Sequence, residues 1–207
     1  MGIENFFGFF ITAVFFTMTP GIDTAFVLNK SIGQGRKSGI YATFGINAGV
    51  LTHTLFAALG LSVLLSKSEY GFTIIKFAGA IYLIYLGFVK FRNREDFLPN
   101  ETKNKVHKDK KNDFWSGFLT NTLNPKVALF FLAFFPQFIN PTQIENPMPF
   151  IALGITYALI GVLWYLLLTI FASAFSQKFE NNPRAGFWLN KLSGIVFIVI
   201  GIKIALT

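Results

Sequence analysis

Thr19-Pro20-Gly21-Ile22-Asp23 interrupts an otherwise apolar stretch that runs from about Phe6 to Leu28. A proline, a glycine and a carboxylate inside such a stretch serve no ordinary packing purpose. A second interruption, Asn124-Pro125-Lys126, lies in another apolar stretch in the other half of the chain. Two broken hydrophobic helices at matching places in two halves of a chain are typical of a binding site in a small transporter.

The composition predicts a membrane protein. Of the 207 residues, 53% are hydrophobic and 14% are charged, whereas a soluble domain carries roughly a quarter charged residues. Residues 38–66 and 146–177 contain no Asp, Glu, Lys or Arg, and each run exceeds the roughly 20 residues that cross a bilayer as a helix. Barrel strands would instead alternate apolar and polar residues. We therefore expect an all-α integral membrane protein.

Several functional classes are excluded or disfavoured. The absence of cysteine removes disulfide scaffolds, thiol redox chemistry and thiolate metal sites. His53 and His107 have no metal-ligand spacing, and no nucleophile–base pair indicates an enzyme, so we expect neither metal nor cofactor. The net charge of +8 could suggest nucleic acid, but the basic residues lie in loops beside apolar spans. This pattern favours the lipid bilayer as partner, with no nucleic acid.

Loop charges predict the orientation. The basic residues concentrate in the first, third and fifth connections between spans, and the fourth, residues 137–150, has no Lys or Arg. Under the positive-inside rule the odd connections are cytoplasmic and both termini lie outside. We expect a multi-pass membrane protein whose first apolar run is a retained span. The six predicted spans are about 4–31, 39–66, 70–90, 114–138, 148–175 and 187–206.

A hydrophilic loop of about 92–113 divides this single transmembrane domain, 1–207, into two repeats of about 1–91 and 114–207. Each repeat has three spans, and because three is odd the second repeat is inverted relative to the first. Helices 1 and 4, broken at Pro20 and Pro125, then correspond to each other, as in many secondary transporters. Glycines such as Gly45, Gly154 and Gly161 predict close helix packing.

Both interruptions have the form of a new helix start. Thr19 precedes Pro20 and Asn124 precedes Pro125; Thr and Asn are good N-cap residues, and proline suits the first helical position. Two helix N-termini inside the membrane would offer free N–H groups and partial positive charge to a small anion. Lys126 adds a full charge roughly 18 Å into its span.

Other polar residues complete the candidate site. Asp23 could stabilise its own half-helix, pair with Lys126, or bind a proton or a substrate ammonium group, and the sequence leaves these alternatives open. Asn47 either faces the cavity or makes an interhelical hydrogen bond, and His53 is either a titratable group or a packing residue. The candidates are Thr19, Pro20, Gly21, Asp23, Asn47, Asn121, Asn124, Pro125 and Lys126, with His53 as an additional one.

Five stretches resemble the lysine exporter/homoserine-threonine exporter (LysE/RhtB) family of translocators. They are Pro20-Gly21-Ile22-Asp23, Gln34-Gly35-Arg36-Lys37-Ser38-Gly39, Ala78-Gly79-Ala80-Ile81-Tyr82-Leu83-Ile84-Tyr85-Leu86-Gly87, Phe118-Leu119-Thr120-Asn121-Thr122-Leu123-Asn124-Pro125-Lys126 and Phe134-Phe135-Pro136-Gln137-Phe138. The resemblance implies a bacterial inner-membrane exporter of amino acids or close derivatives, driven as a secondary transporter by the proton gradient and without a cofactor. It assigns the family's PGxD and NPK motifs to Pro20, Gly21 and Asp23 and to Asn124, Pro125 and Lys126. Asn47 departs from the small apolar residue expected there, which favours a more polar cargo.

Our hypothesis places the carboxylate of a small zwitterionic amino acid at the half-helix N-termini and Lys126. Asp23 receives the ammonium group or the counter-proton, and the two halves rock to give alternating access. Export of a metal or another inorganic cation on the same architecture, a membrane enzyme and a non-transporting scaffold are the alternatives. The sequence leaves open the amino acid, the coupling ion and stoichiometry, and whether the protein acts alone or as a homo-oligomer.

Overall fold

The computed structural model describes residues 2–19, 21–61 and 110–172, together with individual positions between 73 and 92 and between 191 and 206. These residues are mostly helical and contain no strand beyond an isolated antiparallel bridge between Ile3 and Ile139. Two helices, Arg36–Gly60 and Pro147–Ile170, are long and apolar enough to cross a membrane, or up to four if each of two bent helix pairs is one span. Pro20 and most of the predicted spans 70–90 and 187–206 lie outside the described residues.

The first bent pair consists of α1 (Phe6–Met18) and α2 (Ile22–Gln34), which meet at 52°. Helix α1 begins after Asn5, whose side chain accepts a hydrogen bond from the Gly8 N–H. It ends at Thr19, where the backbone becomes extended with ψ of 122°. The interruption predicted near residue 20 is therefore present.

Helix α1 is apolar on both of its faces. Phe9, Ala13 and Phe16 are buried against the rest of the bundle, whereas Phe7 and Phe15 are at least half exposed on the outer face. An outward row of aromatic side chains suits contact with lipid, because hydrocarbon does not penalise exposed apolar surface.

The second bent pair consists of α6 (Lys110–Thr122) and α7 (Pro125–Leu129), bent by 48°. Asn124 is the N-cap of α7 and Pro125 its first residue, so the restart predicted at Asn124-Pro125 is confirmed. The chain continues as a π-helical turn, Phe130–Phe134, and a 3-10 turn, Phe135–Phe138. Helix α6 begins at Lys110, four residues before the predicted span at 114, because Asp113 is buried against neighbouring helices rather than solvated in the loop.

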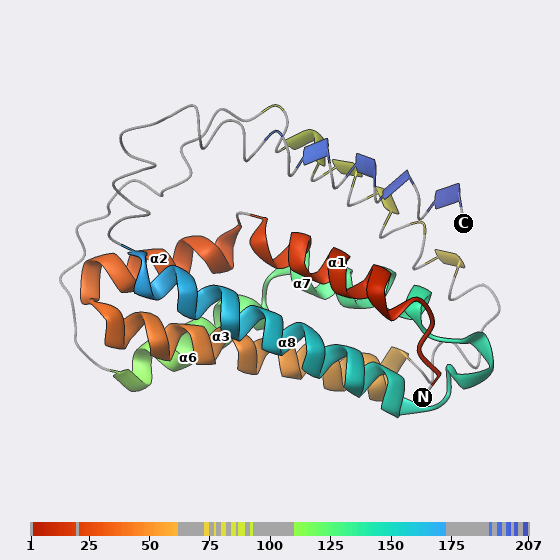
Figure 1. Cartoon of the computed structure of the whole chain (residues 1–207), viewed down its shortest axis with the longest axis horizontal. Helices are drawn as coiled ribbons and strands as arrows, with labels where there is room; N and C mark the ends of the chain where they lie inside the picture. The colour runs from red at the N-terminus through yellow and green to blue at the C-terminus, as the bar shows by residue number, and fades with distance from the viewer. Residues whose placement is uncertain are drawn as a thin grey trace.

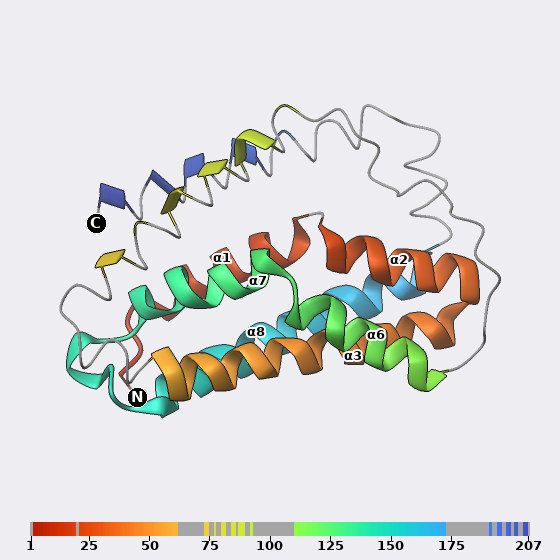
Figure 2. The same ribbon diagram turned by 180° about the vertical axis from the view of Figure 1, so that it is seen from behind.

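Helix α3 (Arg36–Phe56) lies at the centre, followed by a π-helical turn, Ala57–Leu61. It runs parallel to α6 and antiparallel to α8 (Pro147–Ile170), as Figures 1 and 2 show. A Cβ at Gly117 would lie 2.7 Å from the Ala42 carbonyl oxygen, and one at Gly45 would collide with the Phe114 carbonyl. The predicted glycine packing is therefore real, since the α3 and α6 backbones touch where side chains are absent.

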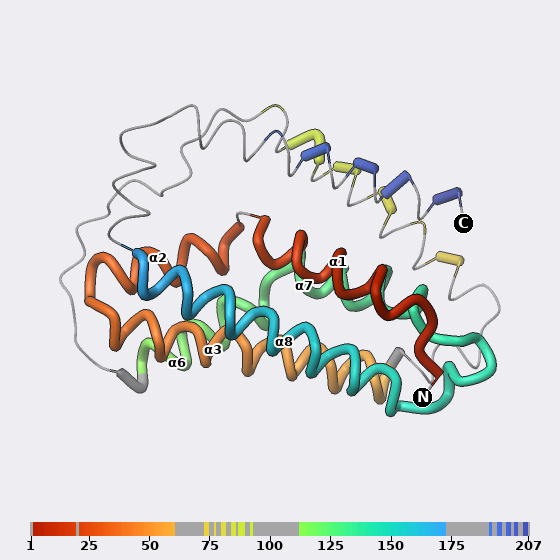
Figure 3. Tube along the Cα trace, viewed as in Figure 1, coloured from red at the N-terminus to blue at the C-terminus, as the bar shows by residue number. Residues whose placement is uncertain are grey.

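A second layer lies beside α1 (Figure 1). The positions described between 73 and 92 and between 191 and 206 are helical and lie side by side (Figures 1 and 3). A Cβ at Gly201 would lie 2.8 Å from the Ala80 carbonyl oxygen. The predicted third and sixth spans are thus neighbours where they are described.

Aromatic side chains fill the space between α1 and the 125–138 segment. The ring centroid of Phe9 lies 5.3 Å from that of Phe135 and 5.4 Å from that of Phe138, both edge-to-face. Phe16 and Phe130 are 4.2 Å apart. These favourable geometries close the end of the bundle that carries the N-terminus, which lies on the right in Figure 1.

Candidate functional site

The two helix breaks, about a hundred residues apart in sequence, meet in the middle of the bundle. Asp23, in the first turn of α2, is 7% exposed. Its carboxylate accepts hydrogen bonds from the Asn121 amide, 2.8 Å from Nδ2 to Oδ2, and from the Asn124 amide, 3.1 Å from Nδ2 to Oδ1. Charge-assisted hydrogen bonds of this kind are what a buried carboxylate requires.

Asn124 performs two tasks with one side chain. Its Oδ1 accepts the Lys126 backbone N–H at 3.0 Å, which caps α7. Because Oδ1 is occupied by a donor, the NH₂ group must face the Asp23 carboxylate, so the amide orientation follows from the hydrogen bonds. The cap of one half-helix is therefore also a ligand of the charge on the other.

Lys126 also reaches from the second break to the first. Its ammonium group donates to the carbonyl oxygens of Phe16 and Thr19, each at 3.2 Å, and lies 4.6 Å from the Phe16 ring centroid. The last carbonyls of a helix have no intrahelical donor and carry partial negative charge. A cation from the second break thus stabilises the C-terminal end of α1, while amides from the second break bind the anion of α2.

A cavity of about 10 Å³ lies between these groups. It is lined by Asp23 and Lys126, by Thr19, Gly21 and Asn124, and by Tyr157 and Tyr165 from α8. Such a volume is close to the smallest that holds one water molecule. A larger ligand therefore requires the surrounding helices to move.

The prediction that Thr19 is the N-cap of the second half-helix is wrong. Thr19 does not cap α2 but is the C-cap of α1, where its hydroxyl donates to the Phe15 carbonyl oxygen at 2.7 Å. This acceptor lies in the same helix four residues earlier, and threonine side chains commonly form such a hydrogen bond. The N-cap of α2 is Gly21, with no side-chain cap bond, and a Cβ there would lie 3.5 Å from Lys126 Nζ. The start of α2 is thus a glycine beside a cation.

Asn47 lies away from this cluster. Its Nδ2 donates to the Thr43 carbonyl oxygen of its own helix at 2.8 Å. Its Oδ1 points at α8, where a Cβ at Gly161 would be 2.5 Å away. Asn47 is not among the cavity-lining residues, and the hydrogen bond that it makes lies within its own helix, so the structure supports neither contact with the cavity nor an interhelical hydrogen bond.

His53 braces the site from behind. Its Nε2 lies 3.2 Å from the backbone carbonyl oxygen of Asn121, which can only accept, so Nε2 carries a proton. The ring is stacked on Phe131, with 5.7 Å between centroids. His53 therefore positions Asn121, which in turn binds Asp23, so the link between His53 and Asp23 is indirect.

A second polar cluster is absent from the candidates predicted from the sequence. Asp113, 1% exposed, pairs with Lys30 at 2.6 Å between Oδ1 and Nζ and also accepts a hydrogen bond from the Ser38 hydroxyl. These residues come from α6, α2 and α3. The available signal was an acid at the end of the 92–113 loop, close behind the basic residues Lys110 and Lys111.

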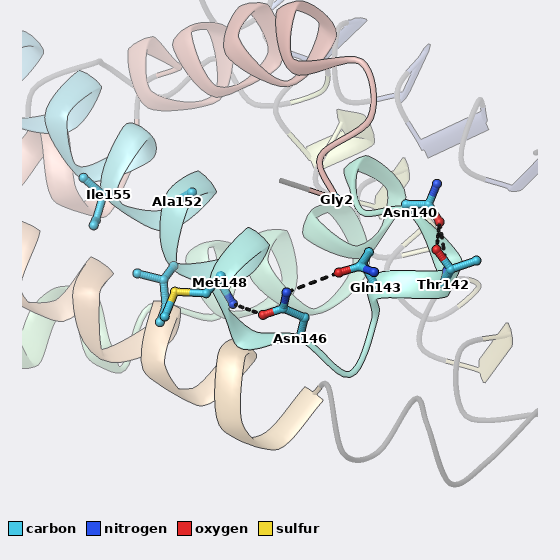
Figure 4. Close-up of a pocket in the computed structure, with 9 residues that line it drawn as sticks. Gly2, Asn140, Thr142, Gln143, Asn146, Met148, Ala152 and Ile155 are labelled. Atoms are coloured by element: carbon cyan, nitrogen blue, oxygen red, sulfur yellow. Dashed lines mark hydrogen bonds between the residues drawn. The ribbon is translucent and has the colours of Figure 1, made fainter.

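A larger pocket lies at the end of the bundle near the N-terminus (Figure 4). Its volume is about 730 Å³, and its described lining, which includes Asn140, Gln143 and Asn146, has no charged side chain. Asn140 and Asn146 accept the backbone N–H groups of Thr142 and Met148. These amides serve as helix caps, so this pocket is a weaker candidate than the small charged cavity.

Comparison with known proteins identifies the family of this chain. The model of the LysE type translocator family matches residues 14–207. The uncharacterized membrane protein YrhP of Bacillus subtilis is 36% identical over 202 residues, which cover 94% of this chain and 95% of YrhP. An uncharacterized membrane protein of Vibrio cholerae is 30% identical over 205 residues, covering 99% of this chain and 98% of the relative. No solved structure matches the chain.

Proposed function

The chain belongs to the LysE type translocator family, and on that premise we propose that this multi-pass membrane protein exports amino acids or close derivatives. Export runs from the cytoplasm across the bacterial inner membrane. The observation that carries the proposal is that Asp23 and Lys126, which have opposite charges, line one small cavity at the meeting point of two broken helices.

A site with both signs of charge suits a zwitterion, because burying either end of an amino acid without a partner is costly. The substrate carboxylate binds Lys126 and the uncapped start of α2 at Gly21, and the ammonium group binds Asp23. In the closed arrangement these two charges are satisfied by side-chain amides and backbone carbonyls. Such neutral partners are weaker than charged ones, so the two ends of a zwitterion can displace them.

The driving force is the proton gradient, and no cofactor is needed. Asp23 is the coupling residue, because one carboxylate that binds either a proton or a substrate ammonium group makes the two exclude each other. Export of a cation fits this site less well, since both carboxylate oxygens of Asp23 face NH₂ donors rather than further metal-ligand oxygens.

The proposed architecture is a single transmembrane domain of six spans, made of two inverted three-helix repeats, with both termini outside and the loop before α6 cytoplasmic. The meeting of the two breaks supports it, because inverted repeats place their broken helices together at the interface between the repeats. The antiparallel course of α3 and α8, the second helices of the two repeats, is a further support.

The test is uptake into inside-out vesicles across a panel of amino acids, with and without a pH gradient. We expect accumulation of at least one zwitterion, abolished by an uncoupler and absent in vesicles with the Asp23→Asn protein. No uptake of any amino acid, together with uptake of a divalent cation, would replace the proposal with the cation exporter.

A further inference from the structure

Helix α2 joins the candidate binding site to the polar cluster at the other end of the bundle. Asp23 lies in its first turn and Lys30 seven residues later, a rise of roughly 10 Å. Residues 23, 27, 30 and 31 lie on one stripe of the helix, at the spacing of successive turns. Three of these four side chains make polar contacts with helices of the second half: Asp23 with Asn121 and Asn124, Lys30 with Asp113, and Ser31 with Thr169.

Glycine bounds α2 at both ends. Gly21 is its N-cap, and Gly35 follows its last residue with φ of 89°, a backbone region that favours glycine. At Gly35 no atom lies within 4 Å of the position that a Cβ would occupy. The chain therefore turns freely where α2 joins α3.

The contacts of α2 differ from those of α3. Helix α3 is held to α6 and α8 by close approach at Gly45, Gly117 and Gly154, where even a methyl group would collide. Contacts of this type cannot open without exposing backbone. Helix α2 packs closely on α3, where a Cβ at Gly39 would collide with the Ser31 hydroxyl oxygen. Its contacts with α6 and α8 are instead separate hydrogen bonds, one ion pair and the apolar side chains of Val27 and Leu28, and apolar contacts have no fixed direction.

We propose that α2 is the cytoplasmic gate of this translocator and that the Lys30–Asp113 ion pair holds the gate closed, with Asp113 positioned on the frame by the Ser38 hydroxyl. The inference rests on the proposed transport function. The helices α3, α6 and α8 stay together as a frame, and α2 moves against them between Gly21 and Gly35. This replaces rocking of two whole halves, because the glycine contacts of α3 tie the two halves to each other.

The position of Asp23 on the same helix explains how binding reaches the gate. A substrate ammonium group at Asp23 takes the place of the Asn121 and Asn124 amides, which are the contacts that hold the start of α2. With that end released, the Lys30–Asp113 pair is the main polar contact that opposes movement of α2. Occupation of the site and opening toward the cytoplasm are thereby linked through one rigid helix.

The experiment uses a single thiol in the cavity. The chain has no cysteine, so Thr24→Cys introduces the only one, at a cavity-lining position that is 2% exposed. Its reaction with a membrane-impermeant maleimide is timed in inside-out vesicles and in intact cells. This readout needs no knowledge of the cargo, so it tests the gate even if amino-acid export is wrong.

In this background Asp113→Ala should speed labelling from the cytoplasmic side about tenfold, since hydrogen bonds to a charged group typically contribute enough to shift a two-state equilibrium by that factor. Labelling from outside should not rise. Arg36→Gln is the matched control: Arg36 donates to the Ile170 carbonyl oxygen at the same end of the bundle, but it ties α3 to α8 rather than α2. It should leave labelling unchanged.

Exchanging the charges, Lys30→Asp with Asp113→Lys, should return labelling to the slow rate. An unchanged rate in Asp113→Ala would overturn the proposal, and so would an equal rise from both sides, which indicates general loosening. Should Asp113→Ala fail to accumulate as folded protein, Lys30→Gln decides the matter, because Lys30 is partly exposed and its loss leaves no cavity in the core.

Discussion

The amide of Asn124 donates to the carboxylate of Asp23 across 3.1 Å, although the two residues are 101 positions apart. The same amide caps α7 through its oxygen. Asparagine alone provides both an acceptor and a donor at this length of side chain: aspartate lacks the donor and glutamine adds a methylene. The contact therefore explains why the second break needs asparagine in particular.

Asn124→Asp should abolish export while leaving the helix intact. Aspartate is as good an N-cap as asparagine, but it places a second carboxylate beside Asp23. We expect transport to fall by about 100-fold or more, because like charges in a buried site are strongly unfavourable. Initial rates in inside-out vesicles, at equal protein level, measure the loss.

The exchanged pair, Asp23→Asn with Asn124→Asp, is the informative control. It restores one carboxylate facing an amide and keeps the cap, so its melting temperature should be close to that of the parent protein. Export should stay low, since the carboxylate then sits on α7 rather than at the start of α2. Full export by the exchanged pair would contradict the role assigned to Asp23.

Asp23→Asn and Lys126→Ala should each abolish export without preventing membrane insertion. The first removes the acceptor for an ammonium group or a proton, and the second removes the charge that binds a carboxylate. Lys126→Ala should also lower the melting temperature, because the Phe16 and Thr19 carbonyl oxygens lose a donor. Efflux from preloaded cells is the measurement, and normal rates in either variant would refute the mechanism.

Gly45→Ala should destabilise the bundle by about 1–3 kcal/mol, because the added methyl group collides with the Phe114 carbonyl on α6. Gly33→Ala is the matched control: it lies in α2 with open space at its Cβ position and should be neutral or slightly stabilising. Thermal unfolding in detergent compares the two. Equal melting temperatures would mean that α3 and α6 are not in backbone contact.

His53→Gln should keep export within about threefold of the parent rate, because the glutamine amide can still donate to the Asn121 carbonyl oxygen. His53→Ala should reduce export by a larger factor and lower the melting temperature. Rates measured between about pH 6 and pH 8 separate the two alternatives left by the sequence. A changed pH profile in His53→Gln would make His53 a titrating group in the cycle.

Local sequence signals predicted part of this structure. The interruption near residue 20 and the capped restart at Asn124-Pro125 follow from cap and proline chemistry, which operates within one helical turn. Thr19 was assigned to the wrong helix because a threonine hydroxyl can also donate to a carbonyl four residues back. Both outcomes have the same sequence pattern, so only the geometry separates them.

Long-range contacts were beyond such reasoning. Nothing within a turn of Asp113 indicates that Lys30 and Ser38 surround it, and charge counting placed it in a solvated loop. Likewise Asn47 has the residue type of a ligand-binding group, but the pairing of α3 with α8 directs it at Gly161. The partner helix decides these cases, and a single sequence does not specify which face it will meet.

Because α1 is apolar on both faces, polarity cannot decide how the helix is turned about its own axis. Aromatic rings on either face of the helix would be solvated equally well by hydrocarbon. Directional contacts fix the rotation of α1 instead: the edge-to-face contacts of Phe9 with Phe135 and Phe138, and the ammonium group of Lys126 bound to carbonyl oxygens at the last turn. A ligand that binds Lys126 therefore removes one of the contacts that fix the rotation of α1.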